Sequence, residues 1–230
     1  MRLAILSDIH GNIEAFNSVI DATKRLKIDK YLLLGDYVGY YFYPRQVVEK
    51  IMDLDFVAIK GNHENILYDL ECGNIELATV TAKYGSGHLI ASRELTSIQK
   101  DFLFSLPCEL KLDFNGTKIS LYHETPWKNN RYIYPNTEIP DTLNDNSDYI
   151  FFGHSHYQFC RKLSNNFIYN PGSVGQNRET GGVSNWIDLD ISYGSLRLKS
   201  TVYSKEELLK NTIKIDGLES YSYKVLNRQI

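Results

Sequence analysis

The chain has 230 residues, 43% of them hydrophobic and 23% charged, which is an ordinary composition for one globular domain. Its formal net charge of −3 provides no basic footprint for nucleic-acid backbones, so nucleic acid is a disfavoured partner. The three cysteines, Cys72, Cys108 and Cys160, match neither a disulfide framework nor a zinc spacing, and no apolar run approaches the ~20 residues of a membrane span. We therefore expect a cytoplasmic protein without membrane contacts, folded as a single domain over residues 1–230.

Apolar runs alternate with amphipathic stretches in the first half of the chain. They predict strands at 2–6, 30–34 and 56–60 and helices at 13–26 and 44–54, the second beginning at Pro44, which suits the first turn of a helix. Residues 75–105 are expected to be helical with a break near 85–87, and Thr96 is the expected cap of the last helix in that stretch.

Hairpin signals dominate the second half. Predicted strands at 109–114 and 118–122 flank Asn115-Gly116, a typical two-residue turn, and a buried strand is expected at 149–152. Two further hairpins pair 159–163 with 167–169 and 183–189 with 195–203, and a short helix follows at 205–211. A βαβ-like beginning and a hairpin-rich end favour one α/β domain with two packed sheets and helices outside.

Polar side chains follow five of the predicted strands. These residues are Asp8 and His10, then Asp36, then Asn62 and His63, then His123, and finally His154 and His156. Ligands of α/β sheets bind beyond the carboxyl ends of strands, so we expect these side chains to meet. Residues two apart on an extended chain face the same side, which lets Asp8 and His10 reach one ion. Carboxylate, amide and imidazole donors without thiolate suit Mn, Fe or Zn better than Ca.

One histidine after a strand is most often an ordinary surface or hydrogen-bonded residue. The complete ordered set, with each member at a strand end, is very hard to reach by chance, and it favours a functional site. His88 falls outside this set within a predicted helix, and we interpret it as structural.

The order of these motifs resembles the calcineurin-like metallophosphoesterase superfamily. Its Asp-x-His, Gly-Asp, Gly-Asn-His-Glu, single His and Gly-His-x-His motifs stand here at 8–10, 35–36, 61–64, 123 and 153–156. The chain is also similar to small bacterial and archaeal phosphodiesterases in Gly-Asp-x-Val-Gly-Tyr at 35–40 and in Asn-Pro-Gly-Ser-Val-Gly at 170–175, which Arg178 follows. The resemblance covers roughly residues 1–203 and leaves 204–230 as a C-terminal extension.

The resemblance implies a four-layer α/β/β/α sandwich of two mixed sheets with helices on the outside. It implies two divalent metal ions, with Mn as the first choice and Fe, Zn, Ni or Mg as alternatives. The first ion would be bound by Asp8, His10, Asp36 and His156, and the second by Asp36, Asn62, His123 and His154. A hydroxide between the ions would attack the phosphoester, and His63 would assist the leaving group.

Other residues near these motifs have expected roles around the substrate. We expect Arg178 and Tyr40 to contact it, with Arg178 holding a phosphate in its guanidinium fork. Glu64 is expected either to orient His63 or a neighbouring group, or to act as a charge at a helix N-terminus. The 170–173 run is expected to support the metal-binding loops.

Two segments differ from the small phosphodiesterases. Tyr41-Phe42-Tyr43 replaces Gly-Pro after Tyr40, and Glu124, followed by Thr125-Pro126-Trp127, replaces the Gly that follows the single histidine. Aromatic residues at the rim of a cleft can stack a nucleotide base. The alternatives for this segment are a packed loop or a contact within a homo-oligomer.

We expect an enzyme that hydrolyses phosphodiester or phosphomonoester bonds of small molecules, nucleotides among them. The alternatives are a nuclease or dinucleotide-polyphosphate hydrolase, and a non-catalytic metal-binding scaffold for protein partners. The scaffold enters because the family includes a retromer subunit that uses this fold to bind proteins. The complete ligand set and His63 favour the enzyme.

Overall fold

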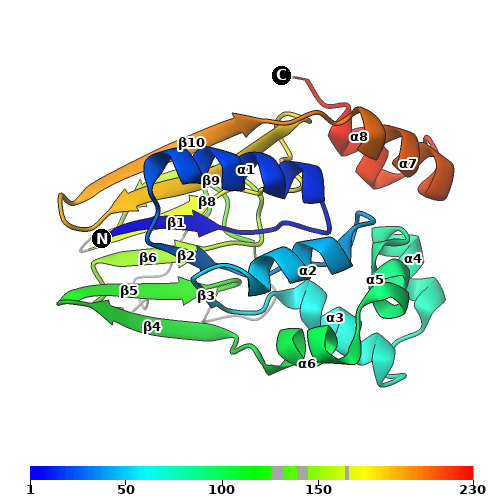
Figure 1. Ribbon diagram of the computed structural model, residues 1–230, viewed down its shortest axis with the longest axis horizontal. Coiled ribbons are helices and arrows are strands. Elements are labelled where there is room, and N and C mark those ends of the chain that lie inside the picture. Colours follow the sequence, from blue (N-terminus) through cyan, green and yellow to red (C-terminus); the bar gives the residue numbers. More distant parts are fainter. Residues whose placement is uncertain (126–131, 139–144, 164–165, 230) are drawn as a thin grey trace.

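The computed structural model describes residues 1–125, 132–138, 145–163 and 166–229, and two five-stranded sheets form its centre (Figure 1). The first sheet has the order β10 (Ser195–Val202), β9 (Val183–Asp190), β1 (Arg2–Leu6), β2 (Lys30–Leu33), β3 (Phe56–Ala58). The second has the order β4 (Glu109–Phe114), β5 (Thr117–Tyr122), β6 (Tyr149–Phe152), β8 (Phe167–Pro171), β7 (Gln158–Lys162). Each sheet combines parallel and antiparallel pairs, so both are mixed, as expected.

The parallel strands place their carboxyl ends on one side of the molecule. In the first sheet β1, β2 and β3 are parallel, and in the second β5, β6 and β8 are parallel. The arrows of β1, β2, β5 and β6 point toward the same end in Figure 1. The loops that follow these strands are therefore gathered at that end.

Two hydrophobic layers cover the faces of β1. Leu3 and Ile5 point into the core between the sheets, whereas Ala4 and Leu6 point into the core beneath the helices, and all four are fully buried. A strand covered on both faces appears as a continuous apolar run, which is how the sequence predicted it.

Helices pack on the outer face of the first sheet and against the segment that follows β2. They are α1 (Ile13–Leu26), α2 (Pro44–Met52), α3 (Asn62–Glu71), α4 (Leu77–Tyr84), α5 (Gly87–Glu94), α6 (Ser97–Ser105), α7 (Glu206–Asp216) and α8 (Tyr221–Leu226). Thr96 caps α6 as predicted, since its side chain accepts a hydrogen bond from the backbone N–H of Gln99. None of the described helices combines the length and the apolar character needed to cross a membrane.

Three helical features differ from the sequence prediction. The sequence gave no range for helix α3, although a helix N-terminus at Glu64 was one alternative. The helix begins with the polar run Asn62 to Asn65, and Leu67 is the one buried apolar side chain among its described residues. Helix α7 extends to Asp216 rather than ending at 211, and α8 was not expected. With six residues, α8 is too short to show a helical period.

The C-terminal helices pack on the aromatic segment that follows β2. Tyr41 and Phe42 are buried in a cluster with Leu208 of α7 and Leu226 of α8. The packed-loop alternative therefore accounts for these two rings, which are covered by the chain itself.

Candidate metal centre

The loops after the strands place several predicted site residues in the left-handed backbone region. These residues are Asp8 (φ 57°) and His10 (φ 52°) after β1, Asp36 (φ 57°) after β2, and His154 (φ 67°) and His156 (φ 64°) after β6. Asp and His adopt this region several-fold more often than most non-glycine residues. Such conformations cost about 1–3 kcal/mol each and persist only where surrounding contacts hold them, which is common at functional sites.

A first group of donors consists of Asp8, His10, Asp36 and His156, whose ligand atoms all lie within 4.8 Å of one another. The Nε2 atom of His156 is 3.2 Å from Asp8 Oδ1 and 3.2 Å from His10 Nε2. His10 Nε2 is 3.8 Å from Asp36 Oδ2. All four residues are buried.

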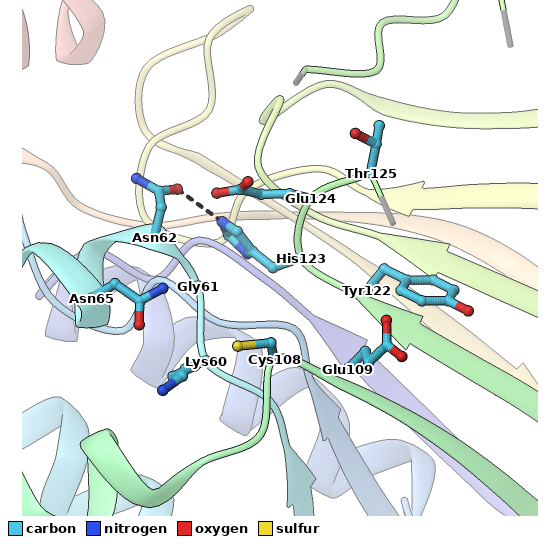
Figure 2. A pocket seen from close by; sticks show the side chains of 10 residues that line it. All are labelled: Lys60, Gly61, Asn62, Asn65, Cys108, Glu109, Tyr122, His123, Glu124 and Thr125. Atoms are coloured by element: carbon cyan, nitrogen blue, oxygen red, sulfur yellow. Dashed lines mark hydrogen bonds between the residues drawn. The ribbon is translucent and has the colours of Figure 1, made fainter. Parts of the chain in front are cut away.

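A second group lies beside the first and shares Asp36. Ligand atoms of Asp36, His123 and His154 also lie within 4.8 Å of one another. His123 Nε2 is 3.2 Å from Asp36 Oδ2 and 3.2 Å from Asn62 Oδ1, a contact drawn in Figure 2. The structure thus brings all seven predicted ligand residues together, with Asp36 in both groups.

Backbone carbonyls orient three of the histidine rings. The Nδ1 atoms of His10, His123 and His156 lie 3.1, 2.6 and 2.8 Å from the carbonyl oxygens of Val38, Leu34 and Gln176. Since a carbonyl accepts, each Nδ1 carries a proton, and each Nε2 is directed toward the centre. Outer hydrogen bonds of this kind fix the tautomer and the ring orientation of metal-binding histidines.

Glu64 supports the same centre from behind. Its carboxylate accepts hydrogen bonds from the backbone N–H groups of Asp36 (2.9 Å), Tyr37 (2.8 Å) and Gly61 (2.8 Å). Both expected roles are therefore present in part, because Glu64 positions a neighbouring loop and also stands in the first turn of α3. Burial and the Asp36 carboxylate raise its pKa, and the three donors oppose that rise.

The electrostatics of the buried groups favour a cation. Burial alone would raise the pKa of Asp36, but His123 and His63 hold it well below its usual range. Burial would lower the pKa of His123, yet Asp36 raises it to about 10. Burial lowers the pKa of His154 to about 3 and that of His156 to about 4, so both are neutral at pH 7.

The donor set fits divalent metal ions. It offers carboxylates, an amide oxygen and neutral imidazoles, which are the ligand types of Mn, Fe and Zn sites. The Nε2 atom of His154 is buried and has no hydrogen-bond partner in the described part of the chain. A buried polar atom without a partner costs about 1–3 kcal/mol, a penalty that a metal bond would remove.

His63 lies at the edge of the two groups. Its Nε2 atom is 4.0 Å from Asp36 Oδ2, and its ring packs edge-on against His10 with centroids 4.7 Å apart. On its other side the ring stacks on His88 of α5, with centroids 4.9 Å apart and planes inclined by 17°. The sequence placed His88 outside the site, and nothing in its helical surroundings could have indicated this contact.

The two residues expected to contact substrate lie next to the centre. The ring of Tyr40 is 4.8 Å from that of His10 and 5.0 Å from that of His63. Arg178 lies over the ring of Tyr132 at 5.6 Å, and Tyr132 in turn stacks on the ring of His154. The sequence gave no indication of Tyr132.

A cavity of about 390 Å³ opens beside the second group of donors. Its lining includes Asn62, His123 and the half-buried Glu124. Figure 2 shows the side chain of Glu124 pointing toward that of Asn62. Pro126 and Trp127, which the sequence placed in this rim, lie outside the described residues.

The 170–175 run supports the metal-binding loops. Asn170 Nδ2 donates to the carbonyl of Gly153 at 2.8 Å, and Ser173 Oγ donates to the carbonyl of Asp8 at 2.7 Å. These bonds fix the loops after β6 and β1 to the same segment, and so to one another.

The sequence pattern of the calcineurin-like phosphoesterase superfamily domain matches residues 1–190. The chain belongs to this superfamily. An uncharacterized protein of Methanocaldococcus jannaschii is 32% identical over 198 residues, which cover 77% of this chain and 77% of that protein. The family that the sequence motifs resemble is thereby confirmed.

Two solved structures of low sequence identity share the fold. A metallophosphoesterase from Sphaerobacter thermophilus covers 100% of this chain and 99% of its own, with a TM-score of 0.77 and 22% identity. A hypothetical protein from Pyrococcus horikoshii covers 98% of this chain and 97% of its own, with a TM-score of 0.79 and 19% identity. The calcineurin-like phosphoesterase fold therefore extends over the C-terminal helices as well.

Proposed function

We propose that this protein is a dinuclear-metal hydrolase of phosphodiester or phosphomonoester bonds in small molecules, nucleotides among them. The observation that carries the proposal is that Asp36 belongs to both donor groups, with His63 beside it. A carboxylate shared between two adjacent ions is the ligand that a two-metal site requires. The packing of α7 and α8 on the aromatic segment supports treating residues 1–230 as one domain.

The chain holds the cations through Asp8, His10, Asp36 and His156 on one side and through Asp36, Asn62, His123 and His154 on the other. Two divalent ions, Mn first, would supply a water made acidic at neutral pH and a positive field for the phosphoryl oxygens. Burial on all sides keeps the carboxylates from bulk water, which strengthens their hold on a cation.

His63 supplies the proton for the leaving oxygen. Burial is the largest influence on its pKa and lowers it well below its usual value. The negative charge of a bound phosphoester acts in the opposite direction and favours the protonated ring. In this role the proton of His63 passes to the departing alcohol.

Arg178 and Tyr40 orient the substrate. The guanidinium carries a permanent positive charge and suits the oxygens of a phosphoryl group. Tyr40 is 6% exposed, and its ring contacts the rings of both His10 and His63, where it limits the space around the reacting group.

The test combines metal analysis with turnover. Metal-free protein reconstituted with Mn is expected to bind two ions per chain and to hydrolyse bis-p-nitrophenyl phosphate or p-nitrophenyl phosphate. Asp36→Asn should abolish turnover, while Asp101→Asn, which changes an exposed carboxylate on α6, should retain it. Two bound ions without turnover of either ester would contradict the proposal and favour the scaffold alternative.

A further inference from the structure

A leaving group protonated by His63 must extend past that ring, and the structure places aromatic side chains there. Tyr84, the last residue of α4, packs edge-on against His63 with centroids 4.9 Å apart. Tyr40 lies 5.0 Å from His63, and Tyr84 is 5.8 Å from Tyr40. His63 is therefore bordered on this side by aromatic rings.

A cavity of about 470 Å³ lies on the far side of Tyr84 from His63. Its lining comes from the end of α4 and the residues that follow it, and from the end of α7 and the start of α8. Figure 1 shows these helices at the end of the molecule toward which β1 points. Tyr84 and Tyr221 both line it, so one wall contacts His63 directly. A volume of this size falls in the range of small-ligand sites, about 300–1,000 Å³.

Tyr221 belongs to the C-terminal extension, beyond the residues 1–190 that match the superfamily pattern. Its ring lies 6.0 Å from that of Tyr40, yet the residue is 40% exposed, so part of the ring surface stays open. The extension is held in place here because Asp216 accepts a hydrogen bond from the backbone N–H of Ser86 at 3.1 Å.

The charges that line the cavity limit what it can accept. Lys83 faces the ring of Tyr84, with Nζ 4.9 Å from the ring centroid, whereas Asp216 and Glu219 contribute two carboxylates. Glu219 pairs with Lys224 at 2.9 Å, so the lining has no excess of positive charge to attract a leaving group that carries further phosphates. An uncharged group with a planar ring and hydrogen-bond donors fits both the rings and the carboxylates.

We propose that this cavity binds the nucleoside of the leaving group, with the base against Tyr221 and Tyr84, which rests on the proposed phosphoesterase function. Hydrolysis then breaks the bond between phosphorus and the nucleoside oxygen. The oxygen of water joins phosphorus with one of its hydrogens, the proton from His63 goes to the nucleoside oxygen, and the second hydrogen of water restores the proton of His63.

The first experiment compares substrates that differ only in the base. Rates with Mn are measured on adenosine 5′-monophosphate against ribose 5-phosphate, and on the methyl diesters of both. Base stacking on aromatic side chains predicts that kcat/KM favours the adenosine member by about tenfold or more.

Tyr221→Ala should reduce this ratio toward one, and Tyr221→Phe should preserve it because the ring remains. Tyr193→Ala, at an 85% exposed position in the turn between β9 and β10, is the matched control and should leave it unchanged.

The second experiment measures adenosine binding without turnover, by NMR titration of the Mn-free protein. Adenosine is expected to bind the wild-type chain and the Tyr193→Ala variant, and about tenfold more weakly to Tyr221→Ala. Turnover of phosphoesters with a base ratio near one, or no adenosine binding, would overturn the nucleoside site alone. Adenosine binding that depends on Tyr221, without hydrolysis of any phosphoester, would overturn the proposed function and leave the site standing.

Discussion

The imidazole ring of His88 stacks on that of His63 at a centroid distance of 4.9 Å, nearly parallel to it. Both side chains are buried, and the absence of a Cβ at Gly39 provides their space, because a Cβ there would lie 2.2 Å from His63 Nδ1 and 2.9 Å from His88 Cε1. The ring of the proposed acid is thus held against His10 on one side and His88 on the other.

We predict that the stack positions His63. The planar shape of the side chain at position 88 should therefore affect activity more than its ability to gain or lose a proton. His88→Ala should lower kcat by roughly tenfold, a part of the 10²–10⁴-fold that a positioned acid contributes. His88→Phe keeps a planar ring in the same space and should retain most of the activity. Steady-state kinetics with Mn separates the two variants, and KM should change less than kcat. Equal loss in both variants at equal folded fractions, checked by circular dichroism, would refute the stacking role.

Glu64 should stabilise the fold through its four backbone hydrogen bonds, the fourth from the N–H of Val38 at 3.3 Å, independently of any metal. In Glu64→Gln one acceptor oxygen becomes an NH₂ that faces backbone donors, which leaves buried N–H groups without acceptors. We expect a loss of about 2–3 kcal/mol in the free energy of unfolding. Urea denaturation of the metal-free protein measures it.

The matched control for that change is Glu49→Gln on α2. Glu49 is about half exposed and pairs with Arg45, so its replacement should cost no more than about 0.5 kcal/mol. Equal effects of the two substitutions would show that the buried hydrogen bonds of Glu64 contribute nothing specific.

The cluster of candidate metal ligands could be predicted from the sequence because each residue is local to a strand end. Asp8 and His10, for example, follow an apolar run directly, and parallel strands bring such ends to one edge whatever the loops do. The two sheets and most strands followed from the same periodicity.

The surroundings of His63 could not be predicted in this way. Tyr84, His88 and Tyr221 reach the site through the packing of three separate helices, and each helix shows only an ordinary amphipathic pattern or, for α8, too few residues for any pattern. Contacts of this kind depend on tertiary packing, for which a single sequence holds no local signal.

His63→Ala should separate catalysis from metal binding. The side chain lies outside both donor groups, so we expect two Mn ions per chain and a fall in kcat of about 10²–10⁴-fold. Metal content by mass spectrometry and turnover of bis-p-nitrophenyl phosphate are measured on the same sample. Loss of a metal ion from this variant would assign His63 to the ligand set instead.

The two metal sites should respond differently to pH. His123 has a pKa raised to about 10 in the metal-free protein, so it is protonated at pH 7 and must lose that proton to bind the second ion. Affinity at this site should rise up to about tenfold per pH unit between pH 6 and 8. His156, with a pKa of about 4, is already neutral there and gives the first site no such dependence.

Mn titrations at pH 6, 7 and 8, with ring ¹⁵N NMR of the metal-free protein to follow His123, test this difference. As a control, His156→Asn removes one imidazole from the first group and should leave the pH dependence of the second site intact. If His123 is neutral at pH 7, or if both affinities are independent of pH, the electrostatic coupling between Asp36 and His123 is weaker than their 3.2 Å separation implies.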